Sequence, residues 1–186
     1  MKISRITVCC VMVCLALSTG LRGQTTASGE RESLYAFVQG FYAWYVPKAL
    51  SDSSVPASEI ALKERSSVFG PQLAAALKED YAAQAKAPGE IVGLDFDPFL
   101  NTQDPCEHYE VGSITQKGDT YLVNVYAICS GKKSSVPDVV PEMQHKNSQW
   151  EFINFRYPNQ AQQYPNSADL LSILKIQRKE RSKAQK

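Results

Sequence analysis

The sequence predicts an α+β domain in which a curved antiparallel sheet of about four to five strands wraps around an N-terminal helix and a further helix follows at the C-terminus. Apolar residues recur at helical spacing over residues 30–46. Residues 107–155 instead alternate as strands do, and turn signals divide them into consecutive strands. Helices segregated from an antiparallel meander are typical of the α+β class.

The first helix is expected over residues 30–46 and is expected to end at Pro47. Its buried face would carry Leu34, Phe37, Val38, Phe41 and Tyr45. Tyr35 and Tyr42 lie seven residues apart and share a neighbouring stripe. Aromatic side chains at this density usually form core, although they could also line one wall of a pocket.

Two more helices are expected before residue 90. Ser58 stands where an N-cap belongs, and the short helix that it begins could run to Val68. Pro71 is suited to the first position of the following helix, which Pro88–Gly89 would end. The buried face of that helix would carry Leu73, Leu77 and Tyr81.

Residues 91–105 are apolar and acidic without a regular period, so we expect a short strand followed by a structured loop. A hairpin follows, because Gly118 can adopt the positive φ that a tight turn at Lys117–Gly118 requires. The second strand of this hairpin, residues 120–128, is largely apolar on both faces. This pattern predicts a central strand that is covered on each side.

The last strands and the final helix complete the predicted order. Pro137 and Pro141 cannot donate to a ladder, so residues 136–145 are expected to form an edge strand or to contain a bulge. A fourth strand is expected over residues 150–155. The final helix is expected to begin after Ser167, which would be its N-cap.

Residues 1–23 have the features of a secretory signal peptide, because basic residues precede an apolar run and small residues follow it. Cleavage after Gly23 or Ala27 would fit this pattern. The apolar run is shorter than the roughly 20 residues that span a bilayer. An uncleaved membrane anchor and a lipoprotein acylated at Cys14 are the alternatives.

The rest of the chain is expected to form one domain over residues 30–176, followed by a basic tail over residues 177–186. Residues 24–174 hold 11 basic and 18 acidic residues, a net charge of −7, whereas residues 175–186 hold six basic residues and one acidic residue. An acidic body argues against nucleic-acid binding, which needs a basic face on the fold. The tail is expected to be a frayed, solvated helix end, or else to touch anionic lipid or a partner, so membrane contact would be at most peripheral.

Two cysteines, Cys106 and Cys129, lie outside the leader, and we expect them to form a disulfide in a periplasmic or extracellular compartment. A two-residue turn at Lys117–Gly118 would place them directly opposite each other, and a three-residue turn would offset them by one residue. A redox or metal-binding pair is disfavoured, because the sequence has neither CxxC spacing nor a third clustered ligand.

The sequence lacks the motifs of several enzyme classes. It contains no HExxH, no GxSxG, no phosphate-binding loop and no dinucleotide fingerprint. The segment Asp95–Asp104 resembles a calcium loop but lacks its glycine and its bidentate glutamate. We therefore predict no catalytic residue, no cofactor and no metal, and we place His108 and His145 on strand faces.

Five residues are candidates for lining a pocket or for anchoring the acidic loop: Tyr42, Asp97, Gln103, Asp104 and Tyr126. Short acidic side chains accept hydrogen bonds from nearby backbone, so Asp97 and Asp104 are expected to hold the loop in shape. Gln103 would be a buried amide that ties the loop to the sheet edge. The alternative is that these carboxylates face a pocket, where a buried acid opposite Tyr42 or Tyr126 could act in catalysis.

Three segments give the chain a resemblance to a known family: FYAWY at Phe41–Tyr45, DPFLNTQD at Asp97–Asp104 and WEFINFRYP at Trp150–Pro158. The chain resembles the bacterial domain-of-unknown-function family 3828 over residues 33–175. That family is similar to the nuclear-transport-factor-2-like (cystatin-like) fold group. The resemblance implies a small envelope protein with a cone-shaped α+β fold and a concave pocket between helix and sheet, and it supplies no catalytic residues.

Together these features predict a secreted or periplasmic non-catalytic protein of the cell envelope that binds an unknown envelope protein or a small ligand. The support is the missing catalytic sets and a fold that often serves as a scaffold. The alternative is a small-molecule enzyme or a ligand carrier that uses the cone-shaped pocket. A protein that neutralises a secreted partner is a further possibility.

Overall fold

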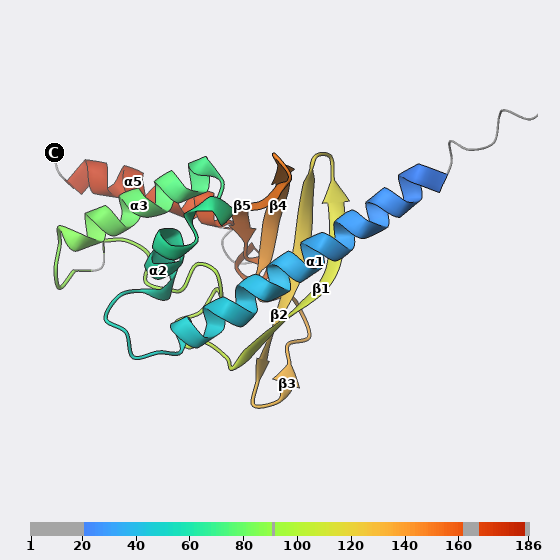
Figure 1. Cartoon of the computed structure of the whole chain (residues 1–186). Coiled ribbons are helices and arrows are strands. Elements are labelled where there is room, and N and C mark those ends of the chain that lie inside the picture. Colours follow the sequence, from blue (N-terminus) through green and yellow to red (C-terminus); the bar gives the residue numbers. More distant parts are fainter. Residues whose placement is uncertain (1–20, 91, 162–167, 185–186) are drawn as a thin grey trace, which may run out of the picture.

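The computed structural model describes residues 21–90, 92–161 and 168–184 and has the predicted α+β architecture (Figure 1). The long helix α1 (Leu21–Ala49) crosses one face of an antiparallel sheet, and α2, α3 and α5 gather at one end of that sheet. The shorter helices are α2 (Ala57–Glu64), the 3-10 turn η1 (Ser66–Val68), α3 (Pro71–Ala85), α4 (Pro158–Ala161) and α5 (Leu170–Ala184).

Most of the predicted signal peptide lies outside the described residues, which begin at position 21. The leader and its cleavage therefore stay predictions. No helix in the described part of the chain is long and apolar enough to cross a membrane.

α1 buries its predicted apolar face against the sheet. The fully buried residues of that face are Leu34, Val38, Phe41 and Tyr45. Tyr42 is buried as well, whereas Tyr35, from the same predicted stripe, is 42% exposed. The prediction that Pro47 ends the helix is wrong, because α1 continues to Ala49. Proline has a helix-compatible φ, and so close to the end of the helix it removes only one backbone donor.

α2 begins at Ala57, without the predicted Ser58 cap. Ser58 is 3% exposed, and its hydroxyl oxygen accepts a hydrogen bond from Tyr81 Oη at 2.6 Å. A contact with the neighbouring helix therefore replaces the local cap. α3 begins at Pro71 as predicted and buries Leu73 and Leu77.

The sheet has five strands in the order β1-β2-β4-β5, with β3 paired to β2. The strands are β1 (His108–Lys117), β2 (Thr120–Cys129), β3 (Lys132–Lys133), β4 (Val140–Lys146) and β5 (Gln149–Arg156). Neighbouring strands are antiparallel. The short strand expected within residues 91–105 does not form in the described residues 92–105, which make a loop with one isolated bridge between Asp97 and Thr102.

Of two further predictions about the strands, the one for β2 needs correction, and the one for β4 is decided between its two alternatives. β2 is central, but its residues alternate between buried and half-buried, so only one of its faces is covered. β4 lies between β2 and β5 instead of at an edge, although it contains Pro141. The ladder between β4 and β2 covers only residues 142–144 of β4, so Pro141 needs no partner on that side. The predicted bulge is present between Glu142 and Met143.

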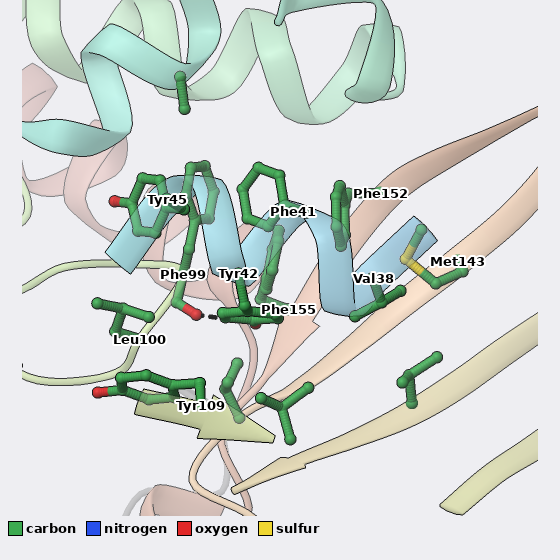
Figure 2. Packing of buried hydrophobic residues seen from close by; sticks show 14 of the residues in the cluster. Val38, Phe41, Tyr42, Tyr45, Phe99, Leu100, Tyr109, Met143, Phe152 and Phe155 are labelled. Carbon is green, nitrogen blue, oxygen red and sulfur yellow. Dashed lines mark hydrogen bonds between the residues drawn. The ribbon is translucent and has the colours of Figure 1, made fainter. Parts of the chain in front are cut away.

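Aromatic side chains fill the space between α1 and the sheet (Figure 2). The fully buried rings are Phe41, Tyr42, Tyr45, Phe99, Phe152, Phe155 and Tyr157. Phe99 enters this core from the loop before β1, and its ring centroid lies 4.8 Å from that of Phe155 and 5.2 Å from that of Phe69. The interior between α1 and the sheet, where the resemblance led us to expect a concave pocket, is therefore packed with side chains of the protein itself.

Cys106 and Cys129 form the predicted disulfide, with their Cα atoms 4.8 Å apart. They are not directly opposite each other. The hairpin turn is Gly118–Asp119 rather than Lys117–Gly118, and the ladder shifts register between Val111 and Ile114. The bond joins the chain just before β1 to the last residue of β2.

Replacing Cys129 with serine is expected to lower the free energy of unfolding by about 2–4 kcal/mol. The reason is that the bond closes a loop with a sequence separation of 23 and restricts the unfolded chain. Urea unfolding with and without a reductant measures the effect. The reductant should destabilise the parent and leave the variant unchanged, and an unchanged parent would contradict the prediction.

The predicted tail from residue 177 is a largely exposed helix end in the described residues, as expected, but it is held at one position. α5 continues to Ala184, and Arg181 Nη1 lies 2.6 Å from Oδ1 of Asp80, which is 1% exposed. The same nitrogen donates to the Val92 carbonyl oxygen at 2.9 Å. A buried carboxylate on α3 therefore holds the end of α5, a contact that basic composition alone does not indicate.

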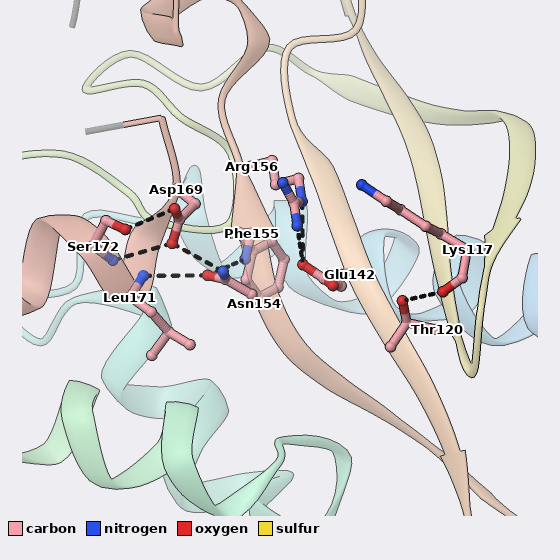
Figure 3. A network of polar contacts seen from close by, with 9 residues as sticks. All are labelled: Lys117, Thr120, Glu142, Asn154, Phe155, Arg156, Asp169, Leu171 and Ser172. Atoms are coloured by element: carbon pink, nitrogen blue, oxygen red, sulfur yellow. Dashed lines mark hydrogen bonds and ion pairs between the residues drawn. The ribbon is translucent and has the colours of Figure 1, made fainter. Parts of the chain in front are cut away.

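A polar network fixes the start of α5 (Figure 3). Asp169 Oδ1 accepts a hydrogen bond from the backbone N–H of Ser172 at 3.1 Å, which is N-cap geometry. Asn154 on β5 donates to the same oxygen at 2.9 Å and accepts from the backbone N–H of Leu171 at 3.2 Å. The cap is therefore Asp169, and the predicted cap Ser167 lies outside the described residues.

Candidate functional site

The loop between α3 and β1 is held against the core by buried tyrosines. Tyr42 Oη donates to the Phe99 carbonyl oxygen at 3.0 Å (Figure 2). Tyr157, the residue directly after β5, donates from its Oη to the Pro98 carbonyl oxygen at 2.8 Å. Because a buried carbonyl without a partner is costly, these bonds stabilise the insertion of Phe99 into the core.

Asp97 shapes the turn that carries Phe99. Its Oδ1 accepts from the backbone N–H groups of Phe99 at 2.9 Å and Leu100 at 3.1 Å. Its Oδ2 accepts from Tyr45 Oη at 2.6 Å. An aspartate that binds the backbone two and three residues ahead is the usual device for fixing such a turn.

Burial raises the pKa of the Asp97 carboxyl from 3.8 to about 6, although the hydrogen bonds from Tyr45, Phe99 and Leu100 act in the opposite direction. Burial also raises the pKa of Tyr45 well above its usual range, and the charge of Asp97 adds to this effect. Tyr45 is therefore protonated at neutral pH and can only donate to the carboxylate.

Asp97 also lines a surface groove of about 440 Å³ between the 51–58 segment and the loop. The walls of the groove include Val55, Leu94 and Phe96 as apolar residues, and Ser58, Thr102 and Gln103 as polar ones. Lys48 at the end of α1 and Asp95 supply its other charged groups. The groove thus joins a desolvated carboxylate to an accessible surface.

The other candidate residues do not converge on this carboxylate. Gln103 is exposed, and its amide donates to the Asp95 carbonyl oxygen at 2.7 Å, so it ties the loop to itself and not to the sheet edge. Asp104 is exposed, and its backbone, not its carboxylate, bonds to the Thr102 hydroxyl. Tyr126 projects from β2 toward Gly112 and Lys133. The Lys133 ammonium lies 4.7 Å from the centroid of the Tyr126 ring.

Tyr45, Ser58 and Tyr81 are site residues that the sequence reasoning did not assign to the loop. Tyr81 donates to Ser58, and a hydrogen bond from Ser58 partly opposes the rise in the pKa of Tyr45. A chain of hydroxyls therefore runs from α3 through α2 to Asp97. The one signal in the sequence is the position of Tyr45 on the buried face of α1, which predicts burial but not its hydrogen-bond partner.

The hydrogen bonds of Asp97 limit what its carboxylate can do chemically. The Asp97 carboxylate already accepts three hydrogen bonds that hold the loop, so its use as a general base would disturb the fold. The groove lining contains serines and a threonine but no histidine. Among the described residues, no group of three or more His, Cys, Asp or Glu side chains could hold a metal ion.

The chain matches no known family and no curated protein. It is similar to a chain in the crystal structure of the type VI native effector–immunity complex Tae3–Tai3 from Ralstonia pickettii, with 24% identity and a TM-score of 0.47 over 66% of this chain and 93% of that chain. The SeMet form of that complex gives 24% identity and a TM-score of 0.46 over 67% and 96%. Neither likeness assigns a family, and the resemblance to domain-of-unknown-function family 3828 stays a prediction.

The pKa of Asp97 has a consequence for stability. A carboxyl whose pKa is higher in the folded state than in the unfolded state binds its proton more tightly when folded, so it stabilises the fold below pH 4 and loses that effect as the pH rises through about 6. Relative to Asp97→Asn, the parent should be about 2 kcal/mol more stable at pH 4 than at pH 7. Urea unfolding of both proteins at both pH values tests this, and a difference independent of pH would contradict it.

Proposed function

We propose that this chain is an exported, non-catalytic protein of the cell envelope that binds a protein partner at its surface. The observation that carries the proposal is the packed interior, in which aromatic side chains occupy the space between α1 and the sheet. An enzyme or a ligand carrier of this architecture needs that space for its ligand. Recognition by this chain is therefore assigned to its outer surface.

The disulfide supports export. Disulfide bonds persist in oxidising compartments and are rare in the cytosol. The bond between Cys106 and Cys129 is therefore what a periplasmic or extracellular protein would carry. The predicted leader, with its short apolar run, agrees with this location.

The groove beside Asp97 is the part of the surface that we assign to the partner. Val55 lines the groove and is 44% exposed, and Leu50, at the turn after α1, is 48% exposed. Exposed apolar side chains beside a polar groove are typical of protein recognition surfaces. The loop on the other side of the groove is fixed by the tyrosine bonds, so the surface is preorganised for binding.

A photo-cross-linking amino acid at Val55 tests the proposal in cells that export the full chain. We expect one discrete cross-linked protein, in addition to the uncross-linked chain, after illumination. The matched control is the same amino acid at Ile176, which is also apolar and is 40% exposed, but lies on α5. Equal products from both positions, or no product from Val55, would overturn the proposed binding surface.

A further inference from the structure

We propose that the groove beside Asp97 binds a positively charged side chain, a lysine or an arginine, of the protein partner. This inference rests on the proposed function, because it names the chemistry by which that partner is recognised. It follows from the negative charge in the groove and from a comparison with Asp80, whose buried carboxylate is paired with a cation.

The protein pairs its fully buried carboxylate, Asp80, with a cation but leaves the half-buried carboxylate of Asp97 without one among the described residues. Asp80 is 1% exposed, and Arg181 neutralises it at 2.6 Å. Asp97 receives hydrogen bonds from a phenol and two backbone amides, all of them neutral groups. In the part of the chain that the structure describes, no lysine, arginine or histidine forms an ion pair with Asp97.

The one cation among the described residues that line the groove already contacts other side chains. Lys48 Nζ lies 3.3 Å from Glu64 Oε2 and 4.8 Å from the ring centroid of Trp44. The remaining charged lining residue is Asp95, which is exposed. The groove therefore has an excess of negative charge, and a cation that enters it would gain an ion pair in a partly desolvated place.

The anchoring of the loop does not account for this charge. The backbone N–H groups of Phe99 and Leu100 need only an acceptor oxygen, which an asparagine side chain would also supply. The amide NH2 of that asparagine could donate to the Tyr45 hydroxyl oxygen, in place of the bond that the carboxylate now accepts from Tyr45. A neutral acceptor would avoid the free energy of burying a carboxylate without a cation. The charge of Asp97 therefore indicates a cationic ligand from outside the chain. Such a ligand can reach the carboxylate through the groove that Asp97 lines.

The shape and lining of the groove fit a long cationic side chain. Val55, Leu94 and Phe96 offer apolar contacts for an aliphatic stem. Gln103 and Thr102 can bond to the backbone that carries that side chain. A lysine or an arginine combines such a stem with a charged end, whereas a free inorganic cation would leave the apolar wall unused.

The test uses small probes with the full exported chain after any processing by the cell. The probes are lysine and arginine, each capped by an N-acetyl group and a C-terminal methylamide, with the equally capped norleucine as the uncharged match. Isothermal titration and amide chemical shifts measure binding. We expect the charged probes to bind about tenfold or more tightly than norleucine, with shifts at Val55, Leu94 and Gln103.

Variants locate the binding. Asp97→Asn should abolish the preference for the charged probes, and Asp119→Asn, at the exposed hairpin turn, is the control for removal of one negative charge. Val55→Arg, a change at an exposed position, should block the groove without unfolding the protein. If Asp97→Asn does not fold, the loss of lysine binding by Val55→Arg shows whether the charged probes bind in the groove. Equal affinity for norleucine and lysine, or undiminished lysine binding by a folded Asp97→Asn or by Val55→Arg, overturns the proposal.

The cross-linking experiment tests the proposed function, and the probe experiment tests the cation site, so a failure of one can be told from a failure of the other. If Val55 cross-links a partner but the charged probes show no preference, the partner surface stands and the cation site is wrong. If the probes bind as expected but Val55 yields no cross-linked protein, the cation site stands and the proposed function is wrong.

Discussion

Replacing Phe99 with alanine is expected to lower the free energy of unfolding by about 3–5 kcal/mol, the range for removal of a fully buried phenyl ring. Phe99 is 0% exposed and contacts rings from three other parts of the chain. Its centroid distances are 5.3 Å to Tyr45, 5.2 Å to Phe69 and 4.8 Å to Phe155. The loss would leave a cavity that rigid neighbours on α1 and β5 cannot close.

Urea unfolding followed by tyrosine and tryptophan fluorescence measures this effect. The matched control is Phe96→Ala, three residues earlier in the same loop. Phe96 is half-buried, and its ring packs against that of Tyr157 at a centroid distance of 5.6 Å. The control should lose less than half as much stability. Equal losses for both variants would mean that Phe99 does not anchor the core in the way described.

Replacing Arg181 with alanine is expected to lower the free energy of unfolding by about 3–5 kcal/mol, because it leaves the Asp80 carboxylate buried without a cation. Asp80 is held by few other groups: Oδ2 accepts from the backbone N–H of Leu94 at 2.9 Å. The site cannot easily rearrange, since a Cβ at Gly93 would lie only 2.6 Å from Asp80 Oδ2.

Arg178→Ala is the matched control for this prediction. Arg178 lies one turn earlier on α5 and pairs with Glu79, but both side chains are about half exposed. Exposed pairs contribute about 0–1 kcal/mol. Thermal unfolding of the two variants should therefore separate them clearly, and an Arg181 variant as stable as the Arg178 variant would contradict the packing of α5 on α3.

The elements that the sequence predicted well depend on local patterns. The buried face of α1 follows from side chains that repeat with the helical period, and Pro71 begins α3 because a proline suits that position. The hairpin forms where Gly118 allows a φ of 61°. The disulfide was also predictable, because Cys106 and Cys129 flank this hairpin.

The elements that the sequence did not predict depend on neighbours. Ser58 has the chemistry of an N-cap, but its hydroxyl oxygen instead accepts a hydrogen bond from Tyr81 on the neighbouring helix α3. Pro141 suggested an edge strand or a bulge, and β4 is an internal strand with a bulge. An internal position is possible because the ladder between β4 and β2 covers only residues 142–144, so the missing N–H of Pro141 breaks no hydrogen bond there. Residues 177–184 looked like a solvated tail, and only the position of Asp80 on α3 gives Arg181 a reason to pack.

The candidate site shows the same division. Asp97 could be singled out from the sequence, because an aspartate before a proline favours a turn whose backbone it can bind. Gln103 and Asp104 could not be placed correctly, since their exposure depends on how the whole loop lies. Tyr45 and Tyr157 are far from Asp97 in the sequence, so their bonds to the loop could not be predicted from spacing.

By itself the sequence determined the α+β class, the buried face of α1, the disulfide and the turn at Asp97. All of these come from residues that are close in the chain or from a cysteine pair on one hairpin. Only the tertiary structure decided that the interior is filled, that Asp80 holds α5, and that the half-buried Asp97 lies in a groove and forms no ion pair with a cation of the described residues. Burial and pairing depend on which distant segments meet, and a local pattern does not contain that information.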